Sequence, residues 1–402
     1  MQTTRAYWTL AIAGAAILAI TMGIRQSLGL FVSPLNTATE LGIVTVSFAL
    51  AVGQFVWGAA QPIFGAIADR VGPVRVMVAG GLLLALGLAV TPFMGSGLGL
   101  VFFLGVVVAA GAGAGSFSIL IGAAAHRMPP ERRAFASGFI NAGGSFGQFV
   151  FAPLSQALIA TIGWIAALWA LAAAALATIP LTAAFREERG EVAKRAGLAG
   201  PTLSAQIAEA FRDRSYWCLH AGFFTCGFHI AFLVTHLPGE VTLCGLPASV
   251  SAASLAIIGL ANIGGSLGAG WLGQTHRMKW ILFWMYGTRA IAVAVYLLLP
   301  KTAATFYAFA AVLGLTWLAT VPPTAGLVAK LFGTRFLATL FGLTLLSHQI
   351  GGFFGAWLGG LAIANTGSYD WMWYADMVLA ALAAMVNLPI REAMPRPATQ
   401  AA

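Results

Sequence analysis

Residues 65–75 read Gly65-Ala-Ile-Ala-Asp69-Arg70-Val-Gly72-Pro-Val-Arg75 and join two long apolar segments, 43–68 and 74–94. Each flanking segment is at least as long as the roughly 20 residues that a helix needs to cross a bilayer. The connection itself has room only for a tight turn, because Gly72 and Pro73 both interrupt a helix. This stretch therefore predicts a helical hairpin in a membrane, with its charged turn at the bilayer surface.

Long apolar segments joined by short charged turns continue through the whole chain of 402 residues. Hydrophobic residues make up 59% of the chain, charged residues only 8%, and the mean hydropathy is +0.88. These charges are too few to cover the surface of a water-soluble protein. Lipid must therefore be the solvent for most of the chain. The predicted spans are 6–31, 43–68, 74–94, 99–126, 134–160, 163–185, 215–238, 248–273, 279–299, 303–330, 336–363 and 371–391.

The basic residues predict how these spans are oriented. The net charge of +9 is spread over short loops and is not gathered on one folded face, which argues against nucleic acid as a partner. All but three of the 21 Lys and Arg residues fall on one side; Lys301 is on the other, and Arg25 and Arg289 are inside spans. Because cytoplasmic loops retain positive charge, we expect a multi-pass inner (cytoplasmic) membrane protein with both termini in the cytoplasm.

A single long polar connection, residues 186–214, lies near the midpoint of the chain. It divides the chain into a predicted N-terminal six-helix bundle, 1–185, a cytoplasmic linker, 186–214, and a C-terminal six-helix bundle, 215–402. Apolar residues recur every four positions within the linker, which predicts a short helix on the membrane surface, and a plain solvated linker is the alternative.

The two halves also match each other at a constant offset of 204 residues. The matching pairs include glycines, prolines and aromatic residues from several spans, which indicates duplication of a six-helix unit. These pairs are Gly23 and Gly227, Pro34 and Pro238, Arg75 and Lys279, Gly138 and Gly342, Gly147 and Gly351, and Phe149 and Phe353.

The turn at residues 65–75 resembles the signature loop of the major facilitator superfamily, and the resemblance covers essentially the whole chain. It implies an all-α membrane protein with twelve transmembrane helices in two pseudo-symmetric six-helix bundles. In that family the acid and arginine of this loop tie neighbouring helix ends together on the cytoplasmic side. The resemblance thus implies gating or structural roles for Gly65, Asp69, Arg70, Gly72 and Arg75. The second-half counterpart, residues 270–279, has no acid, so we expect the two latches to be unequal.

A narrower resemblance is to bacterial monocarboxylate and oxalate-type carriers. It rests on the run Gly23-Ile-Arg25-Gln-Ser-Leu-Gly-Leu-Phe31-Val-Ser-Pro34-Leu and on residues 133–144 and 346–360. In those carriers, cations in the first, eighth and eleventh spans hold the substrate carboxylate, and Arg25 and His348 match the first and last of these. Residues 248–273, the eighth span, contain no Arg or Lys, so either recognition is built differently or the substrate differs.

Arg25 is the strongest candidate for a substrate ligand. An arginine in hydrocarbon costs several kcal/mol, so it should face a partner or a wet cavity. Its guanidinium matches the geometry of a carboxylate with paired donors, which predicts a fixed cation for an anionic ligand. The alternative is a structural arginine satisfied by backbone carbonyls and by Gln26 or Ser27.

The second half offers three further candidates. Arg289, in the ninth span, is either a substrate ligand or the salt-bridge partner of Asp376, the one acid placed near a span there. Without a carboxylate relay, any coupled protons would be carried by histidines or by the substrate. His348 lies near mid-depth of its span. His229 is offset by 204 residues from Arg25, so it should face the same cavity, although a packing role is equally open.

Polar residues inside other spans should face the interior, because lipid offers them no partner. Asn141 and Gln148 are seven residues apart in the fifth span, so one could line the pathway while the other bonds a neighbouring helix. In the tenth span, Pro322 and Pro323 predict a break that frees carbonyls for a gate or a neighbour to satisfy.

These observations predict a secondary transporter of a small organic anion, a monocarboxylate, that works by alternating access as a functional monomer in the lipid bilayer, with or without proton coupling. A multidrug or amphipathic-compound exporter of the same fold is one alternative, and a non-transporting membrane sensor or assembly partner is another. We expect no enzyme, because no nucleophile, base and acid come together in a plausible cavity. The three cysteines lack the paired spacing of a metal or redox site, and no cofactor is expected.

Overall fold

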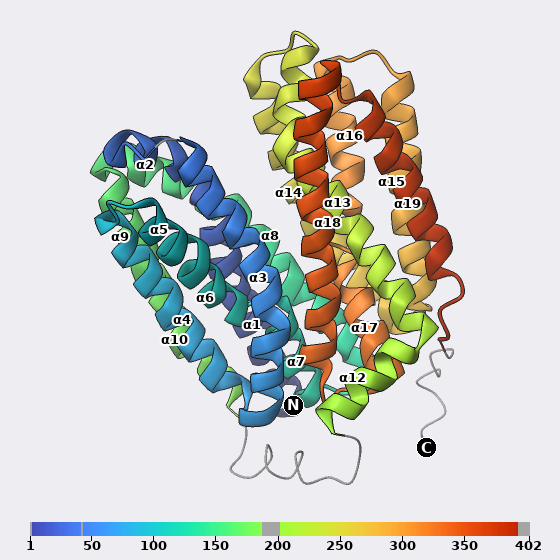
Figure 1. Cartoon of the computed structure of the whole chain (residues 1–402). Helices are drawn as coiled ribbons and strands as arrows, with labels where there is room; N and C mark the ends of the chain where they lie inside the picture. Colours follow the sequence, from blue (N-terminus) through green and yellow to red (C-terminus); the bar gives the residue numbers. More distant parts are fainter. Residues whose placement is uncertain (1, 42, 187–201, 393–402) are drawn as a thin grey trace, which may run out of the picture. The chain divides into compact units, whose positions relative to one another are not determined.

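The computed structural model describes residues 2–41, 43–186 and 202–392, which are almost entirely helical and contain no β-strand (Figure 1). A helix satisfies its backbone N–H and C=O groups within one segment, as hydrocarbon requires of a spanning chain. The predicted all-α class is confirmed.

The helices before the linker follow the first six predicted spans. Gly72 and Gly163, with φ of 92° and 82°, make the turns from which α4 and α9 begin. Glycine suits both turns, because a side chain at positive φ is strained. The elements are α1 (Gln2–Ser27), η1 (Leu28–Phe31), α2 (Val32–Thr39), α3 (Ile43–Val71), α4 (Pro73–Val90), η2 (Thr91–Phe93), α5 (Gly97–Leu100), η3 (Val101–Val108), α6 (Ala109–Ala114), α7 (Phe117–Arg127), α8 (Pro130–Ile162), α9 (Trp164–Leu176), α10 (Thr178–Leu181) and η4 (Thr182–Phe185).

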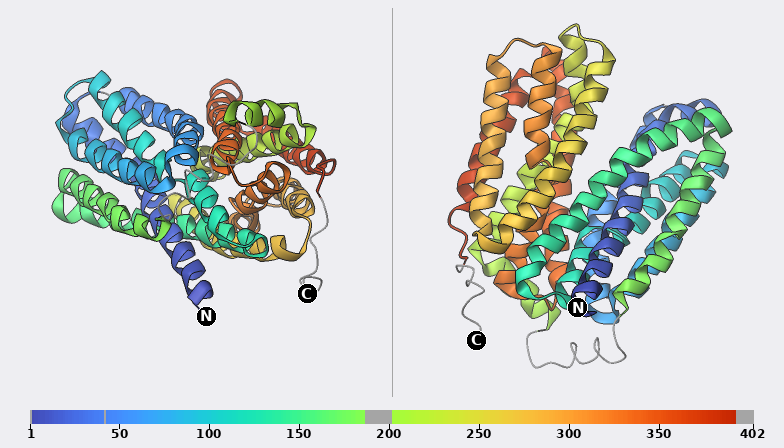
Figure 2. Two further views of the ribbon diagram at one scale, coloured as in Figure 1. Left: turned by 90° about the horizontal axis from the view of Figure 1, so that it is seen from below. Right: turned by 180° about the vertical axis from the view of Figure 1, so that it is seen from behind.

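The later helices run side by side as a second bundle (Figure 2). The predicted linker falls largely outside the described residues, but its predicted short helix is present as α12. The elements are α12 (Leu203–Arg212), α13 (Arg214–Leu243), α14 (Ala248–Thr275), α15 (Met278–Leu298), α16 (Ala303–Thr316), α17 (Val321–Phe332), α18 (Leu337–Thr366) and α19 (Asp370–Asn387).

In the described part of the chain, 11 helical stretches are long and apolar enough to cross a membrane. The twelfth predicted span corresponds to α19, in which Asp370, Asp376 and Asn387 lower the mean hydropathy. The helix nevertheless packs along α13 and α15, where Asp376 is fully buried. The fold is consistent with twelve transmembrane helices, as predicted.

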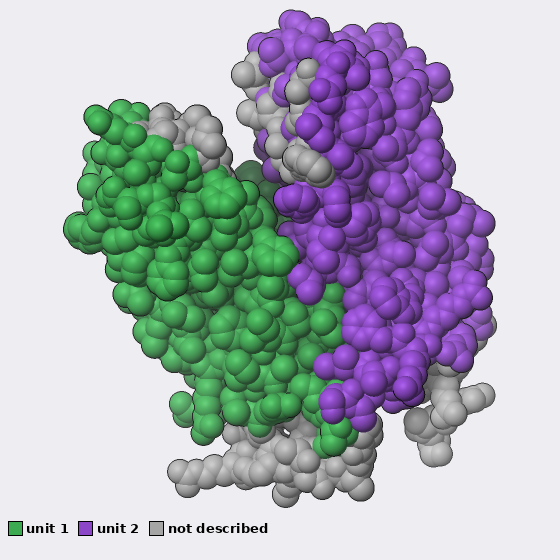
Figure 3. Space-filling view, in the orientation of Figure 1, with its two compact units in different colours: residues 1–128, 143–203, 334–343 green, residues 129–142, 204–333, 344–402 purple. Residues whose placement is uncertain are grey.

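The chain forms two compact units (Figure 3). The first comprises residues 1–128, 143–203 and 334–343, and the second comprises residues 129–142, 204–333 and 344–402. Two helices are therefore shared, because the start of α8 is grouped with the second unit and the start of α18 with the first. The predicted division separates the chain at one point, the linker. The two units are instead defined by which residues contact one another, so each contains several separate segments.

Close helix packing in the first unit recurs in the second. A Cβ atom on Gly147 of α8 would overlap the carbonyl oxygen of Ala19 on α1. Likewise, a Cβ on Gly351 of α18 would overlap the carbonyl oxygen of Phe224 on α13. Small residues let helices approach this closely in a membrane. Because Gly147 and Gly351 are 204 residues apart, the packing repeats at the offset seen in the sequence.

Two spans are broken at corresponding positions. The fourth is interrupted between α6 and α7, at Gly115 and Ser116, and the tenth between α16 and α17, at residues 317–320. Pro322 and Pro323 stand in the first turn of α17, where proline is tolerated because those N–H groups have no intrahelical partner. The predicted break of the tenth span is confirmed.

Candidate functional site

In the first unit, Arg25 lies two residues before the end of α1 and is partly buried. Its Nη2 donates a hydrogen bond to Oε1 of Gln54 on α3, and its Cζ lies 4.1 Å from the ring centroid of Trp57. Among the described residues, no acidic side chain forms an ion pair with it. The guanidinium is therefore positioned by neutral groups, and its positive charge is not neutralised.

The surface of α3 beside Arg25 carries a polar stripe of Gln54, Trp57 and Gln61, spaced three and four residues apart on one helix face. Gln61 is fully buried, and its Oε1 accepts a hydrogen bond of 2.9 Å from Ser116 at the break of the fourth span. Its Nε2 has no hydrogen-bond partner among the described residues. Our reading of the sequence missed these residues, although their helical spacing was a usable signal.

Gln148 and Asn141, both on α8, belong to different units and have different surroundings. Gln148 is half-buried in the first unit, one residue after the close contact of Gly147 with α1. Asn141 is buried in the second unit, where its Nδ2 donates to Ser266 Oγ at 2.7 Å and to the Leu318 carbonyl at 2.9 Å. Asn141 thus holds the broken segment of the tenth span.

Arg289 of α15 serves the same broken segment. Its Nη2 donates to the carbonyls of Thr316 and Trp317, the last residue of α16 and the first of the break. Its Nη1 lies 3.3 Å from Cys226 Sγ, and the side chain is only 1% exposed. The predicted salt bridge with Asp376 is absent from the ion pairs of the described residues. The guanidinium instead supplies the donors that the broken helix lacks.

His229 of α13 is the partner of Asp376 of α19. The distance between His229 Nδ1 and Asp376 Oδ2 is 2.6 Å, and both side chains are fully buried. His348 of α18 is also buried, with its ring centroid 5.5 Å from that of Phe223. The second unit therefore contains four of the predicted ligands, Asn141, His229, Arg289 and His348, and the first contains Arg25 and Gln148. Their joint action on one substrate stays a prediction.

The turn at residues 65–75 meets the start of α18. Asp69 Oδ2 accepts hydrogen bonds from the backbone N–H of Thr339 at 3.1 Å and from its hydroxyl at 2.7 Å. A carboxylate at a helix N-terminus satisfies a free N–H and complements the helix dipole. A Cβ on Gly65 would lie 2.6 Å from the Ala338 carbonyl oxygen, so only glycine admits this approach. Arg70 and Arg75 are exposed.

The corresponding turn of the second half, which lacks the acid, is contacted by an acid that follows α19. Glu392 accepts hydrogen bonds of 3.0 Å from the N–H groups of Met278 and Lys279 at the start of α15. Lys330 also pairs with Glu392, at 2.6 Å. A carboxylate therefore caps a helix at this turn too, although the sequence motif does not show it.

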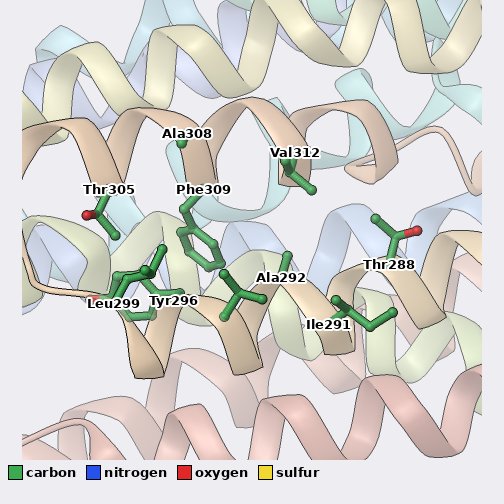
Figure 4. Close-up of a pocket in the computed structure, with 10 residues that line it drawn as sticks. Thr288, Ile291, Ala292, Tyr296, Leu299, Thr305, Ala308, Phe309 and Val312 are labelled. Atoms are coloured by element: carbon green, nitrogen blue, oxygen red, sulfur yellow. The ribbon is translucent and has the colours of Figure 1, made fainter.

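A groove of about 270 Å³ lies between α15 and α16 (Figure 4). Its lining is almost wholly apolar, and Ile291, at 62% exposed, faces outward from a membrane-spanning stretch. Such a groove suits lipid chains and offers no charge to an anion. Among the charged residues described above, Arg25 stays the candidate for binding an anion.

Comparisons with known proteins support the predicted family. The model of the Major Facilitator Superfamily matches residues 9–356. Monocarboxylate transporter 13 of Rattus norvegicus is 25% identical over 376 residues, which cover 92% of this chain and 86% of the relative. The oxalate:formate antiporter of Oxalobacter formigenes is 24% identical over 383 residues, covering 94% and 89%.

Solved structures show the same fold. The proton:xylose symporter XylE aligns with a TM-score of 0.74 at 14% sequence identity and covers 95% of each chain. The E. coli fucose:proton symporter FucP aligns with a TM-score of 0.67 at 16% identity, covering 96% of this chain and 98% of that one. At these identities the likeness speaks for the fold alone.

Proposed function

This chain belongs to the Major Facilitator Superfamily, a family of membrane transporters, and from that premise we propose that it carries a small organic anion, a monocarboxylate, by alternating access. The cell's inner membrane, with both termini in the cytoplasm, is the proposed location, and the loop charges support it. We propose that the functional unit is a monomer.

The observation that carries this proposal is the state of Arg25. Its partners Gln54 and Trp57 orient the guanidinium but bring no negative charge. A guanidinium has five N–H donors, and a paired interaction with a carboxylate is its preferred one. A substrate carboxylate would supply the missing charge, so binding energy is available in this environment for an anion and not for a cation.

The names of the relatives support the substrate class. One relative is named for monocarboxylates and another for oxalate and formate, which are also small carboxylates. Each shares about a quarter of its residues with this chain, so the particular acid belongs to the proposal. Movement of one proton with one monocarboxylate would be electroneutral, and we include it in the proposed mechanism.

A ligand screen tests the substrate class. Purified protein is heated with l-lactate, pyruvate, formate or oxalate, and in parallel with an amphipathic cation such as tetraphenylphosphonium. A ligand at about 100 times its Kd stabilises the folded state by roughly 2.7 kcal/mol, so a true substrate raises the melting temperature measurably.

We expect at least one carboxylate to raise the melting temperature and the cation to have no effect. Shifts from the cation alone would point to an exporter of amphipathic compounds and contradict the proposal. The screen is followed by uptake of the best ligand into proteoliposomes, with protein-free liposomes as the blank.

A further inference from the structure

His229 and Asp376 form a buried hydrogen-bonded pair in the second unit. His229 Nδ1 lies 2.6 Å from Asp376 Oδ2, and neither side chain is exposed to any extent. Asp376 is six residues from the start of α19, so it lies about 9 Å along the helix axis from that end. A carboxylate this deep in a membrane is expensive and marks a functional site by default.

The other described acids lie at helix ends or in turns. Asp69 and Glu392 cap helices, and Glu240, near the end of α13, accepts a hydrogen bond from Tyr296 at 2.7 Å. Each of these has a structural task close to a membrane surface. Asp376 alone among the described carboxylates lies deep in a span. Its Oδ2 is hydrogen-bonded to a histidine side chain, and not to the N–H groups at the start of a helix.

The pair does not use all of its hydrogen-bonding capacity. His229 Nε2 and Asp376 Oδ1 are buried and have no hydrogen-bond partner among the described residues. A purely structural bridge between two helices is stabilised by satisfying every polar atom, because an unsatisfied buried atom costs about 1–3 kcal/mol. Nε2 of His229 can instead bind and release a proton.

Among the described residues, Arg289 is the one buried Arg or Lys side chain. The Trp317 ring centroid lies 5.9 Å from that of His229, and the Trp317 carbonyl accepts a hydrogen bond from Arg289 of α15. Other buried titratable side chains on the helices packed here are Cys226, one turn before His229 on α13, Tyr286 on α15 and His348 on α18. Tyr296 of α15 and Tyr369 before α19 belong to the same core, and Tyr296 donates to Glu240 of α13. Helix α14 contributes none, since it has no acidic, basic, Cys or Tyr residue.

The charge of this core is small in both protonation states. With the exchangeable proton bound, the pair is neutral and Arg289 leaves the core at +1. Without that proton, the pair carries −1, which Arg289 offsets directly. The pair can therefore release its proton without leaving a net charge in low dielectric.

We propose that the His229–Asp376 pair is the proton-binding site of this transporter, and the inference rests on the proposed anion transport. One proton stays between Nδ1 and Oδ2 in both states, and the exchangeable proton binds Nε2 of His229. When it leaves, a neutral imidazole protonated on Nδ1 and an aspartate remain. One proton is bound for each monocarboxylate carried, so the cycle moves no net charge.

The first test does not depend on transport. Protonated imidazole quenches a neighbouring indole, so the emission of Trp317 reports the state of His229. The Trp317 signal is obtained as wild type minus Trp317→Phe, in nanodiscs, over a pH series from about 5 to about 9. We expect the signal to fall as pH falls, to be flat in His229→Gln, and to persist in His236→Gln, the control on the same helix.

The second test measures coupling with l-lactate as the probe. The initial uptake rate into proteoliposomes is compared with and without an inward proton gradient of one pH unit, for which coupling to one proton permits roughly tenfold accumulation. For each protein, the rate with the gradient is divided by the rate of the same preparation without it. We expect the gradient to stimulate wild type and Asp370→Asn, the control at the start of α19, and to leave the rate of Asp376→Asn unchanged.

The outcomes separate this inference from the proposed function. A flat Trp317 signal in wild type would show that the pair holds its proton permanently, and gradient stimulation in Asp376→Asn would show that another group carries it; either result overturns the site. Failure of wild type to carry any carboxylate, with a titrating Trp317 signal, would overturn the substrate class and leave the proton site standing. Should Asp376→Asn not fold, the Trp317 titration of wild type decides.

Discussion

Arg25 and Arg289 are both arginines within spans, but their partners give them different roles. Arg25 contacts a glutamine side chain and a tryptophan face, which leaves most of its donors and all of its charge available. Arg289 donates to two backbone carbonyls and lies beside a thiol, with 1% of the side chain exposed. The first environment suits a ligand for an anion, and the second suits a support for a broken helix.

Replacing Arg289 tests its supporting role. In Arg289→Met, the carbonyls of Thr316 and Trp317 lose their donors, and each unsatisfied buried group costs about 1–3 kcal/mol. We expect a clearly lower melting temperature for this variant, and an intermediate one for Arg289→Lys, which keeps the charge and can still donate. Intrinsic fluorescence during heating measures both.

A stable Arg289→Met protein that no longer binds carboxylates would contradict this account and would make Arg289 a substrate ligand. The matched control is Arg212→Gln, which removes an exposed arginine of α12 and should leave the melting temperature within error.

Residue-scale partners were the least predictable feature of the sequence. Both arginines could be located from the cost of charge in lipid, but the partner of Arg289 could not. Its carbonyl partners become available only because α16 ends at Thr316, and a broken backbone has no side-chain signal. The sequence offered Asp376 as an alternative partner of Arg289, because it is the one acid near a span in that half. In the structure, Asp376 is hydrogen-bonded to His229.

At the scale of the helices, two features recur in both halves of the chain. Tight glycine contacts join α1 to α8 and α13 to α18, and breaks interrupt the fourth and tenth spans. The glycine offset and the two prolines in the tenth span predicted the repeat and one of the breaks. The break in the fourth span has no proline, and it was not predicted. Its Gly115 carbonyl accepts a hydrogen bond of 3.0 Å from Thr21.

Glycine replacement tests the helix contacts. A Cβ on Gly227 of α13 would overlap the His348 carbonyl oxygen of α18, whereas a Cβ on Gly268 of α14 would meet nothing within 4 Å. We expect Gly227→Ala to destabilise by about 1–3 kcal/mol or more, the usual cost of overpacking. Gly268→Ala should be neutral or slightly stabilising, because alanine favours a helix by up to about 1 kcal/mol. Equal melting temperatures for the two variants would rule out the contact.

At the scale of the whole molecule, the fold was the most predictable feature. The hydropathy pattern, the charged turn at residues 65–75 and the repeat all reflect the length and spacing of the spans. The bilayer sets these, because every span must cross the same thickness as a helix, whichever side chains it contacts. The substrate is less predictable, because it depends on a few side chains and not on a spacing that repeats along the chain.

Labelling tests the proposed orientation. In a chain whose native cysteines, Cys218, Cys226 and Cys244, are replaced by serine, single cysteines are placed at Lys301 and at Arg212. A membrane-impermeant maleimide should label Lys301→Cys in intact cells and label Arg212→Cys only after permeabilisation, because positive loops stay in the cytoplasm. The reverse pattern would invert the orientation and refute the assignment of the termini.

The most direct measurement of the central claim is saturable uptake of a radiolabelled monocarboxylate, chosen by the thermal screen, into proteoliposomes containing Arg25 variants. We predict that Arg25→Gln abolishes it, and that Arg25→Lys retains uptake with an affinity lower by roughly tenfold, about 1.4 kcal/mol, because an ammonium cannot form the paired contact. Arg212→Gln should match wild type. Undiminished saturable uptake by a folded Arg25→Gln protein would contradict the assignment of Arg25 as the carboxylate ligand.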